Sequence, residues 1–395
     1  MYYTFLQIFV SALVAFFSTR WIHPYILKIA KFKNIVDNPD SRKLQRTPVP
    51  VMGGLTVIFG VISGLMCHSL FGAVTDMLPV LAVIIIIMII GLIDDIMSLS
   101  ARIRFVIEII LVLYLIHSTG CQLNDFHGLW GVHHIPGYIS MPLTVIACVG
   151  IINAINLIDG VDGYSSGYSI VSCLLFSIIF YMMDNICMAV FAVVVAASLL
   201  PFFFHNVFGI NSKIFIGDSG TLSLGMIFSV FVITILSSPV DIVGFDQNFG
   251  AVPFVLAVLC VPVFDTLRVM IVRMLMGNSP FRPDKTHLHH LFIELGFSHI
   301  GTTMSIIAMN FMVILLWYIS YKLGMSIDLQ LYVVVSLGVF ITFVFYPFVK
   351  SNIRRNTRMC IFLTKVGQAT QIKKYGFWKF AQQLADRSMK SEDAN

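Results

Sequence analysis

The stretch that decides the fold is MLPVLAVIIIIMIIGLIDD, residues 77–95. It carries no charge from Met77 to Ile93, and it ends in two adjacent carboxylates, Asp94 and Asp95. The hydrocarbon core of a bilayer is about 30 Å thick and takes about 20 apolar residues per helix. Carboxylates at the edge of hydrocarbon are costly unless they are paired, hydrated or bound to metal. The stretch therefore predicts a membrane helix that ends in a functional site.

The rest of the chain has the same character. Of its 395 residues, 58% are hydrophobic and 11% are charged, which excludes an ordinary soluble domain. We predict an all-α polytopic membrane protein with about eleven transmembrane helices, the first of them a permanent anchor. The predicted segments are 3–27, 51–70, 77–93, 103–119, 141–158, 167–183, 186–205, 220–237, 251–272, 302–321 and 329–349.

The basic residues predict the orientation. Almost all of the 25 Lys and Arg residues fall on one side of these segments, whereas the opposite loops contain Lys322. Cytoplasmic loops carry the excess of Lys and Arg, so we expect the N-terminus outside and the C-terminus in the cytoplasm. Residues 1–349 form the predicted membrane domain, and 350–395 form a basic cytoplasmic tail suited to anionic lipid. The polar loops expected on the cytoplasmic face are 28–50, 94–104, 159–166, 206–219 and 273–300.

The first polar motif is GLIDD at residues 91–95, followed by Arg102 and Arg104. Paired carboxylates beside cations suit Mg²⁺ binding or proton abstraction from a weakly acidic nucleophile. The alternative is a charged helix end with neighbouring arginines and no chemical role.

The second motif is NAINLIDGVDG at residues 153–163. Asn156, Asp159 and Asp162 are spaced at i, i+3 and i+6, which would align oxygens on one helical face. The two glycines would instead allow a turn that approaches a ligand closely. An ordinary turn would not explain Asn153 and Asn156 inside an apolar span, because a buried amide needs partners. We therefore favour a functional interpretation.

The third motif is FIGDSGT at residues 215–221, where a new apolar segment begins. A turn at a helix N-terminus can hold a phosphate or a metal–phosphate pair around Asp218. An N-terminal cap without further function fits the same residues equally well.

The fourth motif is the loop SPFRPDKTHLHH at residues 279–290. Zinc would need a fourth ligand that is not evident in the sequence. With Arg282 and Lys285 in the same loop, a clamp for a diphosphate fits better. A solvated basic loop is the alternative, and the pair Asp265 and Arg268 upstream is expected to be an intramembrane ion pair. The three histidines of the loop are His287, His289 and His290.

These motifs, together with TPVPVMGG at residues 47–54, resemble those of the polyprenyl-phosphate N-acetylhexosamine-1-phosphate transferase superfamily, of the glycosyltransferase 4 type. The order of all five motifs carries the resemblance. The His-Leu-His-His string is similar to that of bacterial undecaprenyl-phosphate N-acetylglucosaminyl 1-phosphate transferases. One departure is Ser98, where that branch often has a third Asp, so a prenyl-synthase-like metal box is not expected.

The resemblance implies transfer of a sugar-1-phosphate from a UDP-N-acetylhexosamine to undecaprenyl phosphate, with release of UMP. Such an enzyme would lie in the bacterial inner membrane with its site on the cytoplasmic face, and it would begin a cell-envelope glycan. Asp218, with Asn156, would bind Mg²⁺ or alternatively Mn²⁺. Asp94 or Asp95 would orient or deprotonate the acceptor phosphate, and a covalent phospho-aspartate route stays open.

The remaining assignments concern the substrates. Asp159 and Asp162 would bind the nucleotide, and Phe215 would offer a stacking face for uracil. Further candidates for binding the donor or acceptor are Asn153, Lys43, Arg46, Arg282, His287, His289 and His290.

Alternatives remain open at this point. One is an enzyme similar to the MurNAc-pentapeptide phosphotransferases, although three consecutive histidines are absent. A CDP-alcohol phosphotransferase is a second alternative, but the DG-x-x-A-R signature of that class is absent from this sequence. An ion-coupled transporter would be of a different class, but its acidic groups would lie near the membrane midplane in repeated halves. No nucleic-acid signature is present. Neither the sugar nor a homodimeric state can be read from the sequence.

Overall fold

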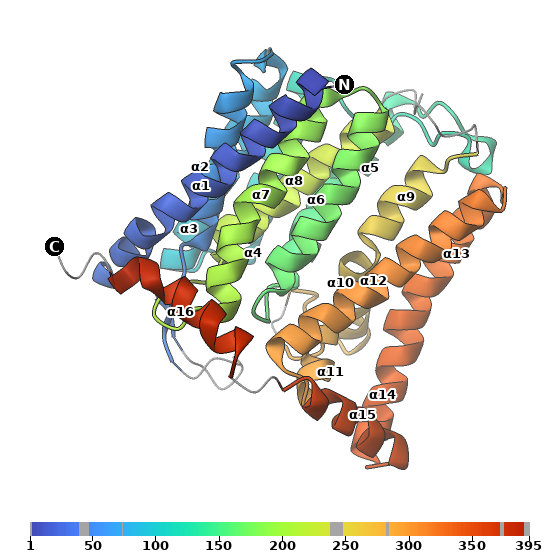
Figure 1. Ribbon diagram of the computed structural model, residues 1–395. Coiled ribbons are helices and arrows are strands. Elements are labelled where there is room, and N and C mark those ends of the chain that lie inside the picture. Colours follow the sequence, from blue (N-terminus) through green and yellow to red (C-terminus); the bar gives the residue numbers. More distant parts are fainter. Residues whose placement is uncertain are drawn as a thin grey trace.

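The computed structural model describes residues 2–38, 47–72, 74–237, 248–281, 284–371 and 375–390 (Figure 1). In this part of the chain almost every element is a helix, and the strands are one short pair, β1 (Val36–Asp37) and β2 (Val49–Pro50). The helices are α1 (Tyr2–Phe32), α2 (Gly53–His68), α3 (Leu78–Met97), α4 (Ala101–Thr119), α5 (Gly137–Leu157), α6 (Tyr164–Met182), α7 (Ile186–Phe208), α8 (Gly217–Ser237), α9 (Ala251–Val258), α10 (Cys260–Leu275), α11 (Leu288–Glu294), α12 (His299–Lys322), α13 (Ile327–Val339), α14 (Tyr346–Arg354), α15 (Arg358–Ala369) and α16 (Phe377–Lys390).

Each of the eleven predicted apolar segments is helical. In the described ranges, eight helical spans are long and apolar enough to cross a membrane, and the bent pair α9 and α10 would make a ninth. The two other predicted segments correspond to α2, which has only 16 residues, and to α4, which carries Arg102, Arg104 and Glu108. The prediction of an all-α multi-pass membrane protein is thus confirmed. The count of eleven spans and the orientation stay predictions.

Helix α8 forms the centre of the bundle and is buried along its whole length. Glycines let the neighbouring helices approach it closely. A Cβ on Gly54 of α2 would lie 2.2 Å from the Gly220 nitrogen, and one on Gly91 of α3 would lie 2.5 Å from the Asp218 carbonyl oxygen. Small residues at helix contacts allow such close packing in membranes. As a result, α2 and α3 surround the N-terminus of α8.

The segment before α8 is held by the β1–β2 region. Phe215 N–H donates to the Pro50 carbonyl, while Gly53 and Gly54 N–H donate to the carbonyls of Phe215 and Ile216, each at 2.8 Å. The FIGDSGT motif at residues 215–221 and the TPVPVMGG motif at residues 47–54 therefore lie side by side.

Helices α9 and α10 meet at an angle of 73°. Pro262 lies two residues into α10 and has no N–H to donate to the Val258 carbonyl. That carbonyl instead accepts hydrogen bonds from the Tyr168 hydroxyl and the Asn310 amide. Polar side chains from neighbouring helices thus satisfy the backbone at the break, as a membrane interior requires.

The last helices, α15 and α16, lie across one end of the bundle, the lower end in Figure 1. Trp378 of α16 packs against Phe208 at the end of α7, with ring centroids 4.7 Å apart. The described part of the predicted tail is thus helical and α16 is docked on the bundle. Its predicted contact with anionic lipid stays a prediction.

Candidate active site

The sequence motifs meet in a cavity of about 480 Å³ at the end of the bundle that carries α11 and α16. It lies between the C-terminal ends of α3 and α5, the N-terminus of α8 and the start of α11. The residues named from the sequence that line it are Asp94, Asp95, Asn156, Asp159, Asp162, Phe215, Asp218 and His290.

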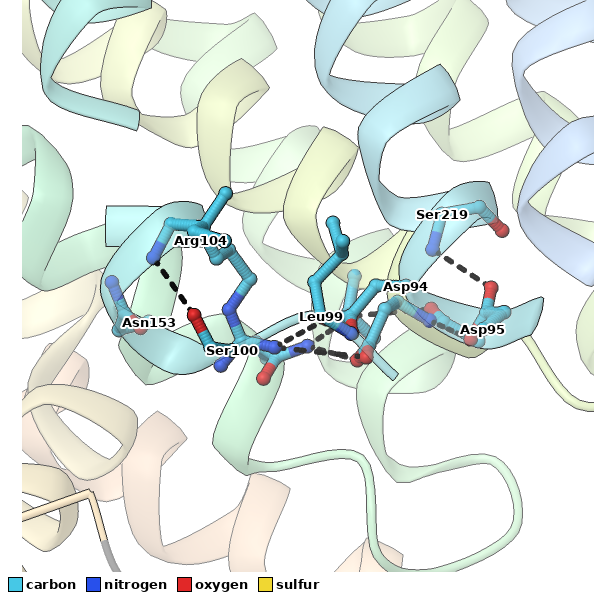
Figure 2. A network of polar contacts seen from close by, with 12 residues as sticks. Asp94, Asp95, Leu99, Ser100, Arg104, Asn153 and Ser219 are labelled. Atoms are coloured by element: carbon cyan, nitrogen blue, oxygen red, sulfur yellow. Dashed lines mark hydrogen bonds and ion pairs between the residues drawn. The ribbon is translucent and has the colours of Figure 1, made fainter. Parts of the chain in front are cut away.

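Asp94 and Arg104 form the first part of this site (Figure 2). Helix α3 ends at Ser98, which has a positive φ of 53°, and this turn brings Leu99 N–H to within 2.6 Å of Asp94 Oδ1. Arg104 of α4 donates through Nη1 to Asp94 Oδ2 at 2.8 Å. The same Nη1 lies 3.6 Å from Asp218 Oδ2, so one guanidinium bridges two motifs that are distant in sequence.

Asp95 has a different environment from its neighbour. Its Oδ1 accepts from Asp218 N–H at 2.8 Å, and its Oδ2 accepts from Ser219 N–H at 3.1 Å. These amides belong to the first turn of α8, where no intrahelical partner exists. Asp95 therefore caps α8 from another helix, and its charge also complements the positive end of the helix dipole. Figure 2 shows it beside Ser219.

Asp218 itself projects into the cavity. Asn156 Nδ2 donates to Asp218 Oδ1 at 2.6 Å and to Thr221 Oγ1 at 2.8 Å. The Asp218 side chain is 34% exposed, and its Oδ2 lies 3.6 Å from Arg104 Nη1. The structure thus brings Asn156 and Asp218 together, and the binding of Mg²⁺ by these two residues stays a prediction.

The arrangement around Asp218 fits a magnesium ion that completes its coordination with substrate. In the described ranges, no group of three His, Cys, Asp or Glu side chains is arranged to hold a metal ion unaided. Mg²⁺ is commonly held by one or two carboxylates, with phosphate oxygens and water as the other ligands. The partly free Asp218 carboxylate, with Asp94 nearby across Arg104, satisfies that requirement.

Asn153 lies behind this cluster and does not line the cavity. It donates to Glu108 Oε2 at 2.6 Å, and Glu108 Oε1 lies 3.8 Å from Arg104 Nε. Glu108 is 1% exposed. The asparagine that we assigned to substrate binding therefore contacts the carboxylate that holds Arg104 in place.

The turn between α5 and α6 presents two carboxylates in different environments. Asp159 Oδ1 accepts from Ser165 Oγ at 2.6 Å. The residue is exposed on the cavity side, and desolvation by the protein that surrounds the cavity raises the pKa of Asp159 to about 7. Burial would also raise the pKa of Asp162, but a hydrogen bond from His299 at 2.8 Å and the charge of Lys213 at 2.6 Å outweigh it and lower that pKa.

Phe215 lies where the prediction requires it, on the cavity wall, and Lys213 Nζ is 5.5 Å from its ring centroid. Asn206 joins the same region to the Asp162 turn, because its Oδ1 accepts from Gly163 N–H at 2.7 Å and its Nδ2 donates to the Ile214 carbonyl at 2.9 Å. The proposed stacking of uracil on Phe215 stays a prediction.

The histidine loop is anchored by the Asp265–Arg268 pair. The predicted ion pair is present at 2.7 Å, and Asp265 Oδ2 also contacts His287 Nδ1 at 2.9 Å. Arg268 stacks on Tyr346 with its guanidinium carbon 3.8 Å from the ring centroid. His287 Nε2 is buried and has no partner in the described residues. A pair that we considered structural therefore positions a motif histidine.

The other two histidines differ in position. His289 is buried against Gly160, where a Cβ would lie 2.2 Å from His289 Nε2, so the turn and the ring fit together only with glycine there. His290 reaches the cavity. Burial lowers the pKa of His289 and lowers the pKa of His290 to about 4, so both rings are neutral at pH 7. His290 can donate a hydrogen bond to a diphosphate in the cavity, but in the free protein neither ring supplies the positive charge that we expected.

Three predicted residues, Lys43, Arg46 and Arg282, lie outside the described residues. Conversely, the motif analysis gave no role to several side chains that the structure places in or next to the cavity. Their partners come from distant helices, so no local pattern indicated them. These side chains are Glu108, Asn206, Lys213 and His299, whereas Arg104 was named as a cation beside the Asp pair without a specific partner.

An all-α membrane protein whose carboxylates, amides and fixed cations meet in one cavity at the end of its bundle has the arrangement expected of a membrane-embedded enzyme. Comparisons with known proteins define that class further. The model of glycosyl transferase family 4 matches residues 77–236. A Bacillus subtilis protein named probable undecaprenyl-phosphate N-acetylglucosaminyl 1-phosphate transferase is 32% identical over 307 residues, which are 78% of this chain and 83% of that protein.

Two further relatives are similar. Decaprenyl-phosphate N-acetylglucosaminephosphotransferase of Mycolicibacterium smegmatis is 32% identical over 73% of this chain and 75% of its own. Undecaprenyl-phosphate α-N-acetylglucosaminyl 1-phosphate transferase of Escherichia coli K12 is 29% identical over 69% of this chain and 72% of its own. The chain belongs to glycosyl transferase family 4, and the resemblance carried by its sequence motifs is confirmed.

Proposed function

We propose that the protein transfers N-acetylglucosamine-1-phosphate from UDP-N-acetylglucosamine to undecaprenyl phosphate and releases UMP. The reaction would take place at the cytoplasmic face of the bacterial inner membrane, as the first membrane step of a cell-envelope glycan. The names of the relatives support the polyprenyl phosphate acceptor and the sugar. The observation that carries the proposal is the Asp94–Arg104–Asp218 cluster at the wall of a cavity formed by membrane helix ends.

The location of the cavity suits the two substrates. The acceptor is dissolved in the bilayer, and the donor is a cytosolic anion, so their phosphates can meet only at the membrane boundary. Phosphoryl transfer depends mainly on positioning and on neutralising charge. A phosphate oxygen of the acceptor attacks the β-phosphorus of the donor, the bond from that phosphorus to the bridging oxygen breaks, and UMP leaves with that oxygen.

Each side chain then has a specific task. Arg104 neutralises charge between the two phosphates, and Asp94 orients or deprotonates the acceptor. Asp218, supported by Asn156, would hold Mg²⁺, which supplies charge neutralisation on the donor diphosphate. Asp159, Asp162 and Phe215 line the wall where the nucleotide would bind, and His290 would donate a hydrogen bond to the diphosphate.

Asp94 is the better candidate than Asp95 to meet the acceptor. Both Asp95 oxygens are bonded to backbone amides that cannot move without unwinding α8. Asp94 has a backbone amide, that of Leu99, on Oδ1, and its Oδ2 is paired with the Arg104 side chain, which also lies near Asp218. We therefore assign Asp95 to positioning.

The test is an assay of purified protein with undecaprenyl phosphate, Mg²⁺ or Mn²⁺, and either UDP-N-acetylglucosamine or UDP-N-acetylgalactosamine. UMP and lipid-linked sugar phosphate are measured together. We expect equal amounts of the two products, a preference for the N-acetylglucosamine donor and loss of turnover on chelation. Release of CMP from CDP-alcohols, or no product from any UDP-sugar, would refute the proposal.

The role of Asp218 is tested by Asp218→Asn in the same assay. We expect metal-dependent turnover to fall by at least about 100-fold, because an amide is a poor magnesium ligand, while the amount of folded protein stays unchanged. The matched control is Asp76→Asn, an exposed carboxylate in the 3-10 turn before α3.

A burst of UMP without acceptor would indicate the covalent route in place of direct transfer.

A further inference from the structure

The segment between α7 and α8 connects the cavity to the C-terminal helix. Residues 210–212 form an irregular bend, followed by Lys213, which pairs with Asp162, and by Phe215 on the cavity wall. The bend therefore determines where two cavity side chains lie.

The N–H groups of this bend are bonded to one carboxylate of α16. Asp386 Oδ1 accepts from the backbone N–H of Ile210 at 3.2 Å, Asn211 at 3.1 Å and Ser212 at 3.0 Å, and also from Ser212 Oγ at 2.8 Å. Asp386 is 8% exposed, although it belongs to a helix that otherwise carries many exposed polar residues. Three successive N–H groups around one oxygen form an anion-binding nest.

The carbonyls of the same bend are bonded to α1. Lys31 Nζ donates to the Asn211 carbonyl at 2.9 Å, and His23 Nε2 donates to the Ser212 carbonyl at 3.0 Å. The backbone of residues 210–212 is thus hydrogen-bonded on both sides, to α1 through its carbonyls and to α16 through its N–H groups. Removing the Asp386 contacts would leave the N–H groups of the bend unbonded, with α1 as its remaining support, and would allow Lys213 to shift.

Side chains of α16 also approach the Asp162 cluster. A second cavity of about 600 Å³ adjoins the first, and the two share Asp162, Lys213 and His299 in their walls. Trp378 and Gln382 of α16 line this second cavity. The C-terminal helix therefore covers the outer side of the cluster that holds Asp162.

We propose that α16 contributes to the active site. In this proposal Asp386 is a positioning residue for donor binding, because the bend that it holds places Lys213 next to Asp162. The proposal rests on the proposed function, because it assumes that the cavity binds a nucleotide-activated sugar. It gives helix α16 a role in donor affinity, whereas the sequence predicted only that residues 350–395 contact anionic lipid. Asp386 is distant from the Asp94–Arg104–Asp218 cluster in the hydrogen-bond network, so the chemical step should be little affected.

The experiment measures donor and acceptor kinetics of Asp386→Ala and Asp386→Asn, with Gln383→Ala as the control on the exposed face of the same helix. We expect Asp386→Ala to raise the donor KM at least about tenfold, since hydrogen bonds to a charged acceptor are among the stronger ones. The kcat and the acceptor KM should stay within about twofold. Asp386→Asn should be intermediate, and Gln383→Ala should match the unsubstituted chain.

A double mutant separates positioning from general destabilisation. If Asp386 acts through Lys213, then Lys213→Met should raise the donor KM, and adding Asp386→Ala to it should cause little further change. Fully multiplicative effects, an unchanged donor KM, or a loss confined to kcat would overturn the inference. Should Asp386→Ala fail to fold, Asp386→Asn provides the same comparison. An unsubstituted chain without transferase activity would instead count against the proposed function.

Discussion

Asp94 and Asp95 are adjacent in sequence but differ in their contacts. Successive residues of a helix project about 100° apart, so Asp94 faces α4 and Asp95 faces α8. One carboxylate pairs with the Arg104 guanidinium and the other caps a buried helix. The two residues should therefore respond differently to substitution.

Asp95→Ala should destabilise the protein and reduce activity together. Loss of a helix cap costs about 0.5–2 kcal/mol, and Asp218 would lose the turn that aims it into the cavity. Asp94→Ala should reduce turnover with a smaller effect on stability. Thermal unfolding in detergent and UMP release measure the two effects. A larger loss of stability for Asp94→Ala than for Asp95→Ala would contradict the assignment.

His290→Gln should retain more activity than His290→Ala, because a neutral imidazole acts here as a hydrogen-bond donor that an amide can replace. Burial lowers the pKa of His290 to about 4, below its ordinary value of 6.5. The unfolded chain then takes up a proton between pH 6.5 and about 4 while the folded chain does not, so stability falls as pH decreases through this window.

The pH dependence of unfolding tests whether the pKa of His290 is lowered in the folded protein. We expect the fall in melting temperature between pH 6.5 and 4 to be smaller in His290→Gln than in the unsubstituted chain. If His290→Gln is as inactive as His290→Ala, and the pH profile is unchanged, then His290 acts as a cation in the complex with substrate.

At the scale of elements, the site depends on how closely three helix ends approach one another. The N-terminus of α8 touches α2 at Gly54 and α3 at Gly91. Both contacts are between backbones, so their distance cannot adapt to a larger side chain. The position of Asp218 follows from this packing, because its own backbone is part of the contact.

Gly54→Ala tests this packing. The added Cβ would lie 2.2 Å from the Gly220 nitrogen, which forces α2 away from α8 and typically costs about 1–3 kcal/mol. We expect a lower melting temperature and loss of activity. Gly150→Ala in α5 is the control, because a Cβ there meets nothing within 4 Å and alanine favours helix. Equal activity of the two variants would show that the α2–α8 contact does not position the site.

At the scale of the whole molecule, the motif loops converge at one end of the bundle, where α11, α15 and α16 also lie (Figure 1). The opposite end carries the loop between α4 and α5, with its bridge between Asp125 and His134. The excess of Lys and Arg predicts that the first end faces the cytoplasm. The orientation of the protein in the membrane can be measured by labelling one introduced cysteine at each end of the bundle.

Met276→Cys and Tyr138→Cys serve this purpose, because the native side chains are 73% and 79% exposed. A membrane-impermeant maleimide should label Tyr138→Cys in intact cells, and should label Met276→Cys only after permeabilisation. The unsubstituted chain, with its seven native cysteines, gives the baseline. The reverse pattern would place the cavity outside the cell and contradict both the orientation and the cytosolic donor.

The sequence by itself determined the all-α membrane fold, the positions of the apolar helices and the family. Hydropathy and helix length are local properties, and the motifs keep their order along the chain whatever the helices do. Most of the cavity residues were predictable for the same reason, since Asp94 and Asp218 each end or begin an apolar run and Asn156 is an amide inside one.

Only the tertiary structure decided what each group contacts. It placed Asn153 against Glu108, joined Asp162 to Lys213 and His299, and brought Asp386 to the bend before α8. Asp386 and Ser212 are 174 residues apart in the chain. Such partners are selected by the packing of whole helices, which no local pattern of residues contains.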